Sequence, residues 1–287
     1  MLNYRNAAPW RHLLFLLLIC PGLQTMADED TSTPLVRKVD FGFALKNFRY
    51  KEYDDTGKLL DREYGFIPGF VLGLSESDRE WDYKGSFLYH AGNVVYDGQT
   101  NTGIPIATRT DEKIIDATFL AERWYRDSND QKRYAWYGGV GYRHWFRDIR
   151  STTTSGGSPV SGLTETYQWW YGLVGGKHIL ADAGKSQWQA DLRLTRTIRP
   201  TIHIELPGFD DTTQDLGERL GVRLSTPWRY ELEKSSIFFI EPYMEAWSLG
   251  RSSTTPLSSN GVPVGTIYEP RSEGRNFGIT LGLSRDL

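Results

Sequence analysis

Cysteine is almost absent from this sequence: of its 287 residues only Cys20 is a cysteine, and it lies near the N-terminus. It falls within residues 1–27, which read as a leader, so the mature chain has no disulfide bond and no cysteine-bound metal. Long apolar runs are missing too. The longest, residues 13–20, covers about eight residues, whereas a membrane-spanning helix needs about 20. These absences exclude a disulfide scaffold and a helical membrane protein.

An excess of charge of one sign is also missing. The chain has 33 basic and 36 acidic side chains, for a net charge of −3. This balance gives no electrostatic basis for binding nucleic acid. The sequence contains no Gly-x-Ser-x-Gly, no His-Glu-x-x-His, no acidic calcium loop and no phosphate-binding glycine loop before a helix. We therefore expect no nucleic-acid partner, no metal, no cofactor and no recognisable catalytic residue.

The histidines offer one candidate for catalysis. A histidine-dependent site needs its groups positioned together, but the histidines of the mature chain are scattered over different segments. They are His90, His144, His178 and His203. Only His203 has acidic neighbours in a shared connection, because Asp210 and Asp211 follow it by seven and eight positions. This pairing is the candidate catalytic pair; the alternative is that all four histidines are structural.

Residues 1–27 have the organisation of a secretory signal peptide. Basic residues precede the apolar run, and Thr25-Met26-Ala27 supplies small residues for cleavage before Asp28. Cys20 raises the alternative of a lipoprotein, but its neighbours Ile19 and Pro21 disfavour lipid modification. We predict export with removal of the leader, followed by a short flexible polar segment over residues 28–35.

Aromatic residues and glycine are abundant. Aromatics make up 14% of the chain, with 10 Trp and 16 Tyr, and there are 29 Gly. From residue 36 onward, apolar and polar residues alternate with the period of two that is typical of strands. The segments with this pattern are residues 37–50, 62–74, 80–90, 113–125, 133–145, 165–179, 187–199, 218–227, 236–247 and 276–283. The sequence therefore predicts an all-β protein of about ten strands.

The connections between these segments alternate in length. The short ones are residues 75–79, 126–132, 181–186 and 228–235. The long ones are residues 51–61, 91–112, 147–164, 200–217 and 250–274. Short periplasmic turns, long extracellular loops and an even strand number are typical of outer-membrane barrels, in which only alternate residues face lipid. We predict one closed antiparallel transmembrane β-barrel over residues 36–287.

The last segment, residues 276–283, carries a family resemblance. Its spacing of a polar residue, a glycine and two apolar residues, at Asn276, Gly278, Leu281 and Leu283, resembles the C-terminal signal strand of bacterial outer-membrane β-barrels. The resemblance implies a Gram-negative outer-membrane protein whose last strand is read by the barrel assembly machinery. In that family the chain usually ends on an aromatic residue, whereas this chain ends on Leu287.

In size and strand number the chain also resembles the omptin proteases. That resemblance implies acidic pairs and an Asp–His pair at the outer strand ends. Asp97 and Asp111 lie well apart in the sequence, and no acidic pair has a matching Asp–His partner. We therefore transfer no omptin catalytic residue to this chain.

The two faces of the strands predict different environments. The apolar face is expected to contact lipid, with aromatic girdles formed by Tyr64, Trp81, Tyr134, Trp136, Tyr167, Trp169 and Trp188. The other face is expected to place a network of opposite charges in the lumen. Its members are Lys46, Lys84, Asp82, Asp116, Glu122, Arg143, Asp191, Arg193, Arg219, Arg223, Glu241 and Glu245. This network either braces a narrow barrel or lines a polar path or small-ligand pocket around Arg219 and Arg223.

These features predict an integral outer-membrane protein with a structural, surface-exposed or narrow-channel role. In small barrels side chains largely fill the interior, which disfavours a general diffusion porin. The alternatives are an outer-membrane enzyme, either an omptin-like protease or a lipid-modifying hydrolase, and an adhesin or ligand-binding protein that acts through residues 91–112 and 250–274. The expected partners are outer-membrane lipid and lipopolysaccharide, the assembly machinery, and a small solute or surface ligand.

Overall fold

The computed structural model describes residues 35–100, 102–233 and 235–287. The predicted signal peptide, residues 1–27, and residues 28–34 lie outside this part of the chain. The wall strands are β1 (Val36–Tyr53), β2 (Leu59–Ser77), β3 (Trp81–Gln99), β4 (Pro105–Arg126), β5 (Lys132–Ile149), β8 (Leu163–Ala183), β9 (Ser186–Glu205), β11 (Leu220–Ser225) with β12 (Trp228–Glu233), β13 (Ser236–Leu249) and β16 (Arg271–Asp286). Short strands in the connections are β6 (Thr152–Thr153), β7 (Pro159–Val160), β10 (Thr212–Asp215), β14 (Thr255–Ser259) and β15 (Val262–Ile267).

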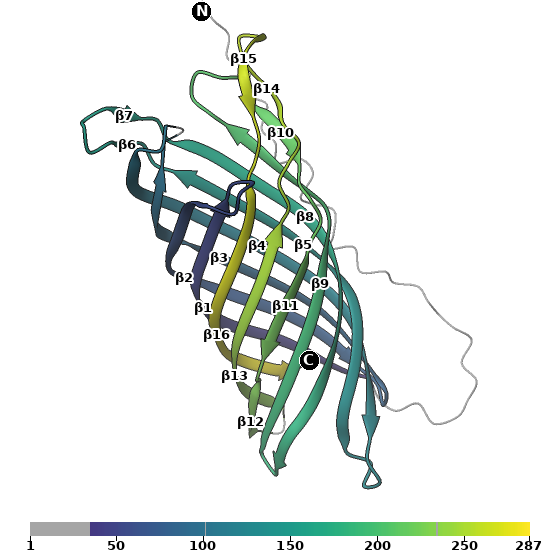
Figure 1. The fold of residues 1–287 in the computed structure, drawn as a ribbon. Coiled ribbons are helices and arrows are strands. Elements are labelled where there is room, and N and C mark those ends of the chain that lie inside the picture. The colour runs from purple at the N-terminus through teal and green to yellow at the C-terminus, as the bar shows by residue number, and fades with distance from the viewer. Residues whose placement is uncertain (1–34, 101, 234) are drawn as a thin grey trace, which may run out of the picture. The chain divides into compact units, whose positions relative to one another are not determined.

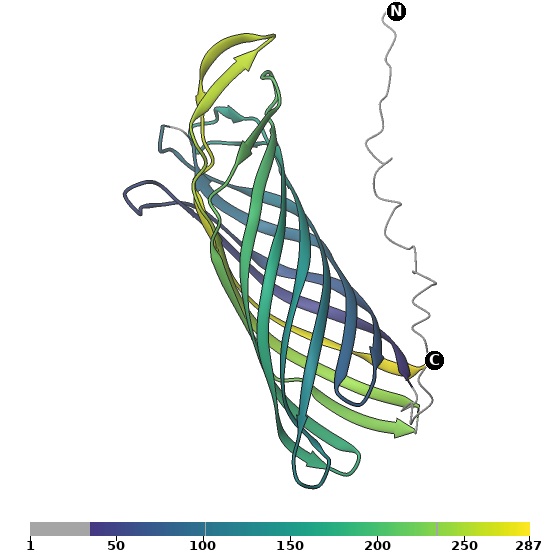
Figure 2. The same ribbon diagram turned by 90° about the vertical axis from the view of Figure 1, so that its right-hand side faces the viewer.

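The wall strands form one closed antiparallel sheet, shown in Figures 1 and 2. Each strand pairs with its neighbour in the chain, β8 pairs with β9, and β16 pairs with β1 to complete the circle. Counting β11 and β12 as one interrupted strand, the barrel has 10 strands, which confirms the predicted fold class. No helix in the described ranges is long and apolar enough to cross a membrane.

The two ends of the barrel differ. At the end where β1 begins and β16 finishes, which we call the terminal end, Lys38 lies opposite Asp286 and the turns between strands are short. The opposite end, which we call the loop end, carries the longer connections over residues 150–162, 206–219 and 250–270. The predicted alternation therefore holds for these three connections, whereas the other two at the loop end, residues 54–58 and 100–104, are no longer than the terminal-end turn over residues 127–131.

The lengths of several connections were predicted wrongly. The expected loop over residues 91–112 is mostly strand, because β3 continues to Gln99 and β4 begins at Pro105. β4 has 22 residues, about twice the 9–11 that a membrane-spanning strand needs. Polar side chains on these extensions made them look like loops, although they continue the ladder beyond the apolar band.

The expected turn over residues 228–235 is also mostly strand. Proline has no N–H to donate and interrupts the ladder at Pro227. The register is nevertheless unchanged on both sides of it: Ser225 pairs with Tyr243 before the interruption, and Trp228 pairs with Ile240 after it. β12 therefore completes the wall between β9 and β13 at the terminal end.

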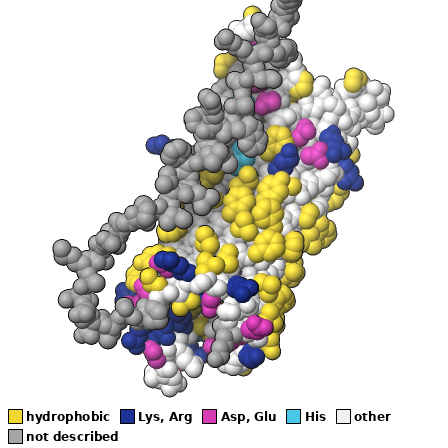
Figure 3. Space-filling model, turned by 180° about the vertical axis from the view of Figure 1, so that it is seen from behind, with side chains coloured by type: hydrophobic (Ala, Val, Ile, Leu, Met, Phe, Trp, Pro, Cys, Tyr) yellow, Lys and Arg dark blue, Asp and Glu magenta, His cyan; other side chains and the backbone are white. Residues whose placement is uncertain are grey.

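The outer surface carries an apolar band, seen from behind in Figure 3. Phe43 and Trp136 are 62% and 66% exposed there, as expected for side chains that face away from the lumen. On β16 the face assignment was correct as well: Phe277 and Leu281 are exposed, while Asn276 is buried. Exposed apolar rows of this kind suit contact with lipid.

The faces of β8 were predicted the wrong way round. Tyr167 and Trp169, expected in an outer girdle, are buried in the lumen, and Trp170 faces outward instead. Because Trp169 and Trp170 are adjacent, both alternating sets of this strand contain an aromatic residue, and the period alone does not choose between them. Pairing with β5 decides the face, since Tyr171 lies opposite Gly141 and occupies the space that this glycine leaves.

Buried apolar side chains pack inside the lumen, most of them in its loop-end half. Trp145 stacks on Tyr167 with ring centroids 4.6 Å apart and meets Tyr50 edge-on at 5.0 Å. The full cluster is Phe48, Tyr50, Ile67, Val94, Ile114, Leu120, Tyr137, Trp145, Tyr167, Trp169, Tyr171, Leu173, Ile202, Ile204, Leu216 and Leu249. This cluster is the core of the barrel.

Candidate binding site in the lumen

Arg147 lies at the centre of the closed, loop-end half of the lumen. Its side chain is 0% exposed and contacts four carboxylates, at 2.5 Å from Glu165, 3.1 Å from Glu63, 3.2 Å from Glu52 and 3.9 Å from Glu112. Together these five residues are the Arg147 cluster. Such a group is stable only while the cation is present, because a buried carboxylate without a partner is costly.

Aromatic side chains enclose the Arg147 cluster. The guanidinium lies 4.4 Å from the centroid of the Tyr50 ring, and the Trp145 indole donates a hydrogen bond to Glu112. Rings and ion pairs together seal this half of the lumen.

Sequence reasoning missed the Arg147 cluster because Glu52, Glu112 and Arg147 fall in ranges expected to be loops, while Glu63 and Glu165 lie at the start of expected strands. The signal that would have found it is continued alternation. Arg147 follows Arg143 and Trp145 at every second position on β5, and Glu165 precedes Tyr167 and Trp169 in the same way on β8.

The middle of the lumen holds a second set of charges. Arg143 contacts Asp116 at 2.6 Å and Glu245 at 3.6 Å, and Lys46 contacts the same Glu245 at 3.6 Å. The Tyr171 hydroxyl donates to Asp116 at 2.6 Å. These contacts join β1, β4, β5, β8 and β13 across the barrel.

A third set lies nearer the terminal end. Lys84 contacts Glu122 at 2.6 Å, and Lys177 also donates a hydrogen bond to Glu122. Lys84 and Lys132 lie 3.8 Å and 3.0 Å from Asp82, and Lys177 lies 3.9 Å from Asp191. Lys132 and Lys177 were not in the predicted network.

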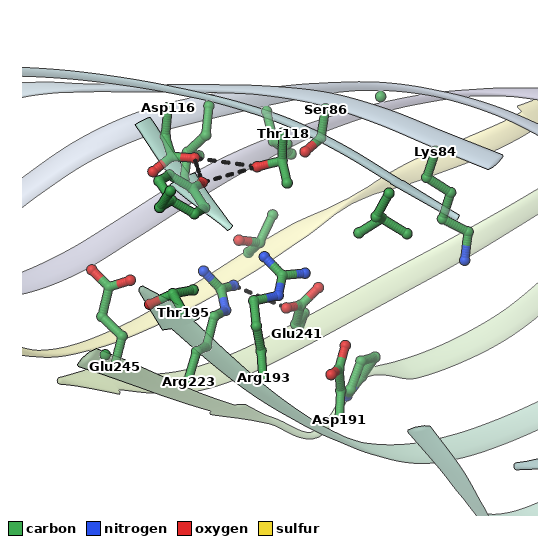
Figure 4. A pocket seen from close by; sticks show the side chains of 18 of the residues that line it. Lys84, Ser86, Asp116, Thr118, Asp191, Arg193, Thr195, Arg223, Glu241 and Glu245 are labelled. Carbon is green, nitrogen blue, oxygen red and sulfur yellow. Dashed lines mark hydrogen bonds and ion pairs between the residues drawn. The ribbon is translucent and has the colours of Figure 1, made fainter. Parts of the chain in front are cut away.

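A cavity of about 230 Å³ lies between the second and third of these charged sets, and members of both line it. Figure 4 shows Arg193, Arg223 and Glu241 reaching into it from neighbouring strands. Arg223 pairs with Glu241 at 2.9 Å and lies 3.8 Å from the centroid of the Tyr243 ring. Apolar side chains complete the lining, among them Leu88, Leu120, Trp169, Phe239 and Trp247.

Two arginines in the cavity have hydrogen-bonding capacity to spare. The Nε atoms of Arg193 and Arg229 are buried, and neither has a hydrogen-bond partner among the described residues. Arg193 lies over the Tyr137 ring, at 5.7 Å from its centroid. A buried donor without a partner costs free energy, so an anion that accepts from these groups is stabilised.

The residues of the predicted charge network are therefore divided between the lumen and the surface. Ten of its members form ion pairs inside the barrel: Lys46, Lys84, Asp82, Asp116, Glu122, Arg143, Asp191, Arg223, Glu241 and Glu245. Arg193 lines the cavity without a carboxylate partner among the described residues. Arg219 was predicted in the lumen but is exposed, lies against Gly250 and does not line the cavity. The change of register before β11 displaces it.

The candidate catalytic pair does not form. The His203 ring shares a hydrogen bond of 2.9 Å with Thr213. Asp210 instead accepts from the backbone of Asn260 and Gly261, at 3.0 Å and 2.8 Å, which ties it to the β14–β15 hairpin. Within the described ranges, no group of three or more His, Cys, Asp or Glu side chains has an arrangement that could hold a metal ion.

Comparison with known proteins supports the fold. No protein-family model matches this chain, and no curated protein matches it. The outer membrane protease OmpT of Escherichia coli is similar in structure, with a TM-score of 0.55 over 90% of this chain and 98% of that chain, at 11% sequence identity. OprG of Pseudomonas aeruginosa matches with a TM-score of 0.39 over 89% and 97% of the chains, at 10% identity. The likeness to OmpT identifies the fold of an outer-membrane β-barrel.

Proposed function

We propose that this protein resides in the outer membrane of a Gram-negative bacterium, in contact with lipid and lipopolysaccharide, after export and insertion by the barrel assembly machinery. The closed sheet supports this, because a barrel without free edges pairs the backbone groups that would otherwise face lipid. The apolar outer band supports it too. A folded barrel shifts on an unboiled gel relative to a boiled one. A chain that stays soluble without detergent contradicts the proposal.

Within that location, we propose that the barrel binds a small anion with an apolar part. The observation that carries this proposal is the pair of buried Nε donors, on Arg193 and Arg229, at a cavity that also has apolar walls. The cavity is smaller than the roughly 300–1,000 Å³ pockets that enclose drug-sized ligands, so it suits a small charged group and a few carbons.

The closed loop-end half favours binding over free diffusion. The loop-end half buries Arg147, Glu63 and Glu112 almost fully. In the cavity, by contrast, the side chains of Lys84 and Glu241 are 28% and 30% exposed. Solvent therefore reaches the terminal-end part of the lumen and not the loop-end part. An open pore is not expected.

Octanoate, a water-soluble carboxylate with an apolar chain, tests the binding proposal. We expect calorimetry on the detergent-solubilised barrel to show saturable binding, weakened at least tenfold by Arg193→Gln or Arg229→Gln, because a hydrogen bond to a charged group contributes about 1.5–3 kcal/mol. Arg133→Gln is the matched control, since Arg133 lies at a terminal-end turn and pairs with Asp127. Absence of saturable binding, or equal loss in the control, contradicts the proposal.

A second candidate function rests on the β14–β15 hairpin. Val262 and Val264 are exposed on this small two-stranded sheet at the loop end, where few apolar residues are otherwise expected. This favours the surface-ligand alternative for residues 250–274 only, since residues 91–112 are mostly strand. Replacing both valines with serine should abolish binding of the protein to cell surfaces or matrix; unchanged binding excludes this role.

A further inference from the structure

The barrel wall is interrupted between β11 and β13. β11 pairs with β13 from Val222–Ala246 to Ser225–Tyr243, and the next link toward the loop end is the isolated bridge between Gly217 and Gly250. Between these links, no ladder pair joins residues 218–221 to residues 247–249, all of which the structure describes. On their other sides both strands remain paired, with β9 and β16.

The register explains the interruption. Extending the β11–β13 ladder would place Leu220 opposite Ser248, but the bridge at Gly217–Gly250 is displaced by one residue from that register. Four residues of one strand therefore face three of the other, as in a β-bulge. Unpaired backbone at membrane depth is tolerated where it lines a cavity.

A cavity does lie on each side of this interruption. The lumenal cavity and a second depression of about 300 Å³ share the lining residues Leu220, Gly221, Val222, Ala246 and Trp247. The depression is also lined by residues of the outer face, such as Leu194 and Arg275. At the interruption, therefore, only these five residues stand between the lumenal cavity and the outer depression.

The outer side of the interruption lies at the edge of the apolar band. Leu220 is 71% exposed, and Leu194 beside it is also exposed. Toward the loop end, charged pairs replace these leucines: Arg196 with Glu218 at 3.4 Å, and Arg275 with Glu273 at 3.3 Å. This is the level at which lipid head groups would meet acyl chains.

The inner side offers polar groups. The Trp247 indole Nε1 is buried with no hydrogen-bond partner among the described residues. Beyond it the cavity holds the Arg193 and Arg223 guanidiniums. Glycine at position 221 leaves room beside the interruption, because a Cβ there would lie 2.7 Å from the Thr195 hydroxyl oxygen and 3.2 Å from the Ala246 carbonyl oxygen.

We propose that the interruption is a lateral opening through which a single-chain amphipathic anion enters from the membrane. Its acidic group reaches Arg193 in the cavity, and its acyl chain remains between Leu220 and Ser248 in contact with lipid. The proposal rests on the proposed anion binding and adds the route and the ligand class. Because the cavity is small, a long acyl chain does not fit inside it and stays outside the barrel wall.

A bilayer-borne probe tests the route. The folded barrel is reconstituted in phospholipid vesicles that contain a long-chain fatty acid with a diazirine near its carboxylate. After irradiation, we expect label on cavity residues Leu88 and Leu120, which lie across the lumen from the opening. Ser248→Trp, which adds bulk at the outer mouth, should reduce this label at least fivefold. Met244→Trp, on the outer face of the same strand where the ladder is intact, should leave it unchanged.

A reversible disulfide bond across the opening distinguishes blocked entry from a variant that is misfolded. In the mature chain, which has no cysteine, Leu220→Cys with Ser248→Cys places two thiols across the opening, and Leu224→Cys with Met244→Cys places two across the intact ladder, away from both cavities. Oxidation of the first pair should abolish labelling of the cavity residues, and reduction should restore it. Oxidation of the second pair should leave the labelling unchanged. Cavity label that is absent in the wild type, or unaffected by oxidation of the first pair, overturns lateral entry. Octanoate binding in micelles then shows whether anion binding itself survives.

Discussion

The Tyr171 ring lies directly over Gly141 on the neighbouring strand, and its hydroxyl donates to Asp116 at 2.6 Å. The same relationship recurs in the lumen. Each of three other aromatic residues lies opposite a glycine and covers it, in the pairs Tyr137–Gly175, Tyr243–Gly278 and Trp247–Gly274. Glycine at these positions provides the room for large rings inside a narrow barrel.

Replacing Gly141 should therefore destabilise the barrel. A Cβ at this position overlaps the Tyr171 ring, and overpacking a core costs about 1–3 kcal/mol. We expect Gly141→Ala to lower the unfolding midpoint in urea when the protein is held in micelles. Gly172→Ala is the matched control on β8, because a Cβ there meets no other atom within 4 Å. Equal effects of the two substitutions would contradict the role of the ring.

The Arg147 cluster should be sensitive to loss of its cation. Arg147→Met leaves Glu52, Glu63, Glu112 and Glu165 without their shared partner, and breaking a buried pair in this way costs about 3–5 kcal/mol. Unfolding in urea should show this loss as a lower midpoint.

Arg150 provides the control for that substitution. It pairs with Asp111 at 2.8 Å, but both side chains are largely exposed, and exposed pairs contribute about 1 kcal/mol or less. Arg150→Met should therefore change the midpoint little. A small effect of Arg147→Met would mean that the four carboxyls are already neutral in the folded barrel.

The barrel, its strand number and its outer face followed from the sequence because period-two alternation determines them. The faces of β8 did not, because Trp169 and Trp170 make both sets aromatic and only cross-strand packing on Gly141 selects one. Glu52, Glu112 and Arg147 of the Arg147 cluster were missed because charged residues on strand extensions resemble loop residues in composition. The cavity depends on which ion pairs form in space: within the described part of the chain Arg193 has no carboxylate partner, although Asp191 is two positions away.

Two turns should lose stability when the pH is lowered. Asp54 and Asp127 each accept hydrogen bonds from groups within their own turns, which lowers the pKa of both carboxyls. The hydrogen bond from the Thr56 hydroxyl lowers the pKa of Asp54 most, and the one from the Gln131 backbone N–H lowers the pKa of Asp127 most. Because the folded pKa lies below the unfolded one, this stabilisation is present at neutral pH and is lost as pH falls through the folded value.

Hydrogen exchange at the amides of Lys58 and Gln131 measures that loss. Both amides donate to these carboxylates, so their protection should fall below about pH 4, after correction for intrinsic exchange. Asp54→Asn should remove the pH dependence at Lys58 and leave it at Gln131. Protection that stays constant down to pH 2 contradicts the assignment.

The closed loop-end half predicts the electrical behaviour of the barrel. Trp145 and Tyr167 stack at 4.6 Å and close the lumen beside Arg147. In planar bilayers the wild type should therefore give no steps or very small ones, and Trp145→Ala with Tyr167→Ala should give steps several-fold larger. Tyr134→Ala with Trp136→Ala removes two exposed rings from the outer face and should not change conductance. Gel migration before and after boiling verifies that each variant is folded. Large steps in the wild type, or no gain in the Trp145 and Tyr167 variant, would mean that the aromatic core does not close the passage.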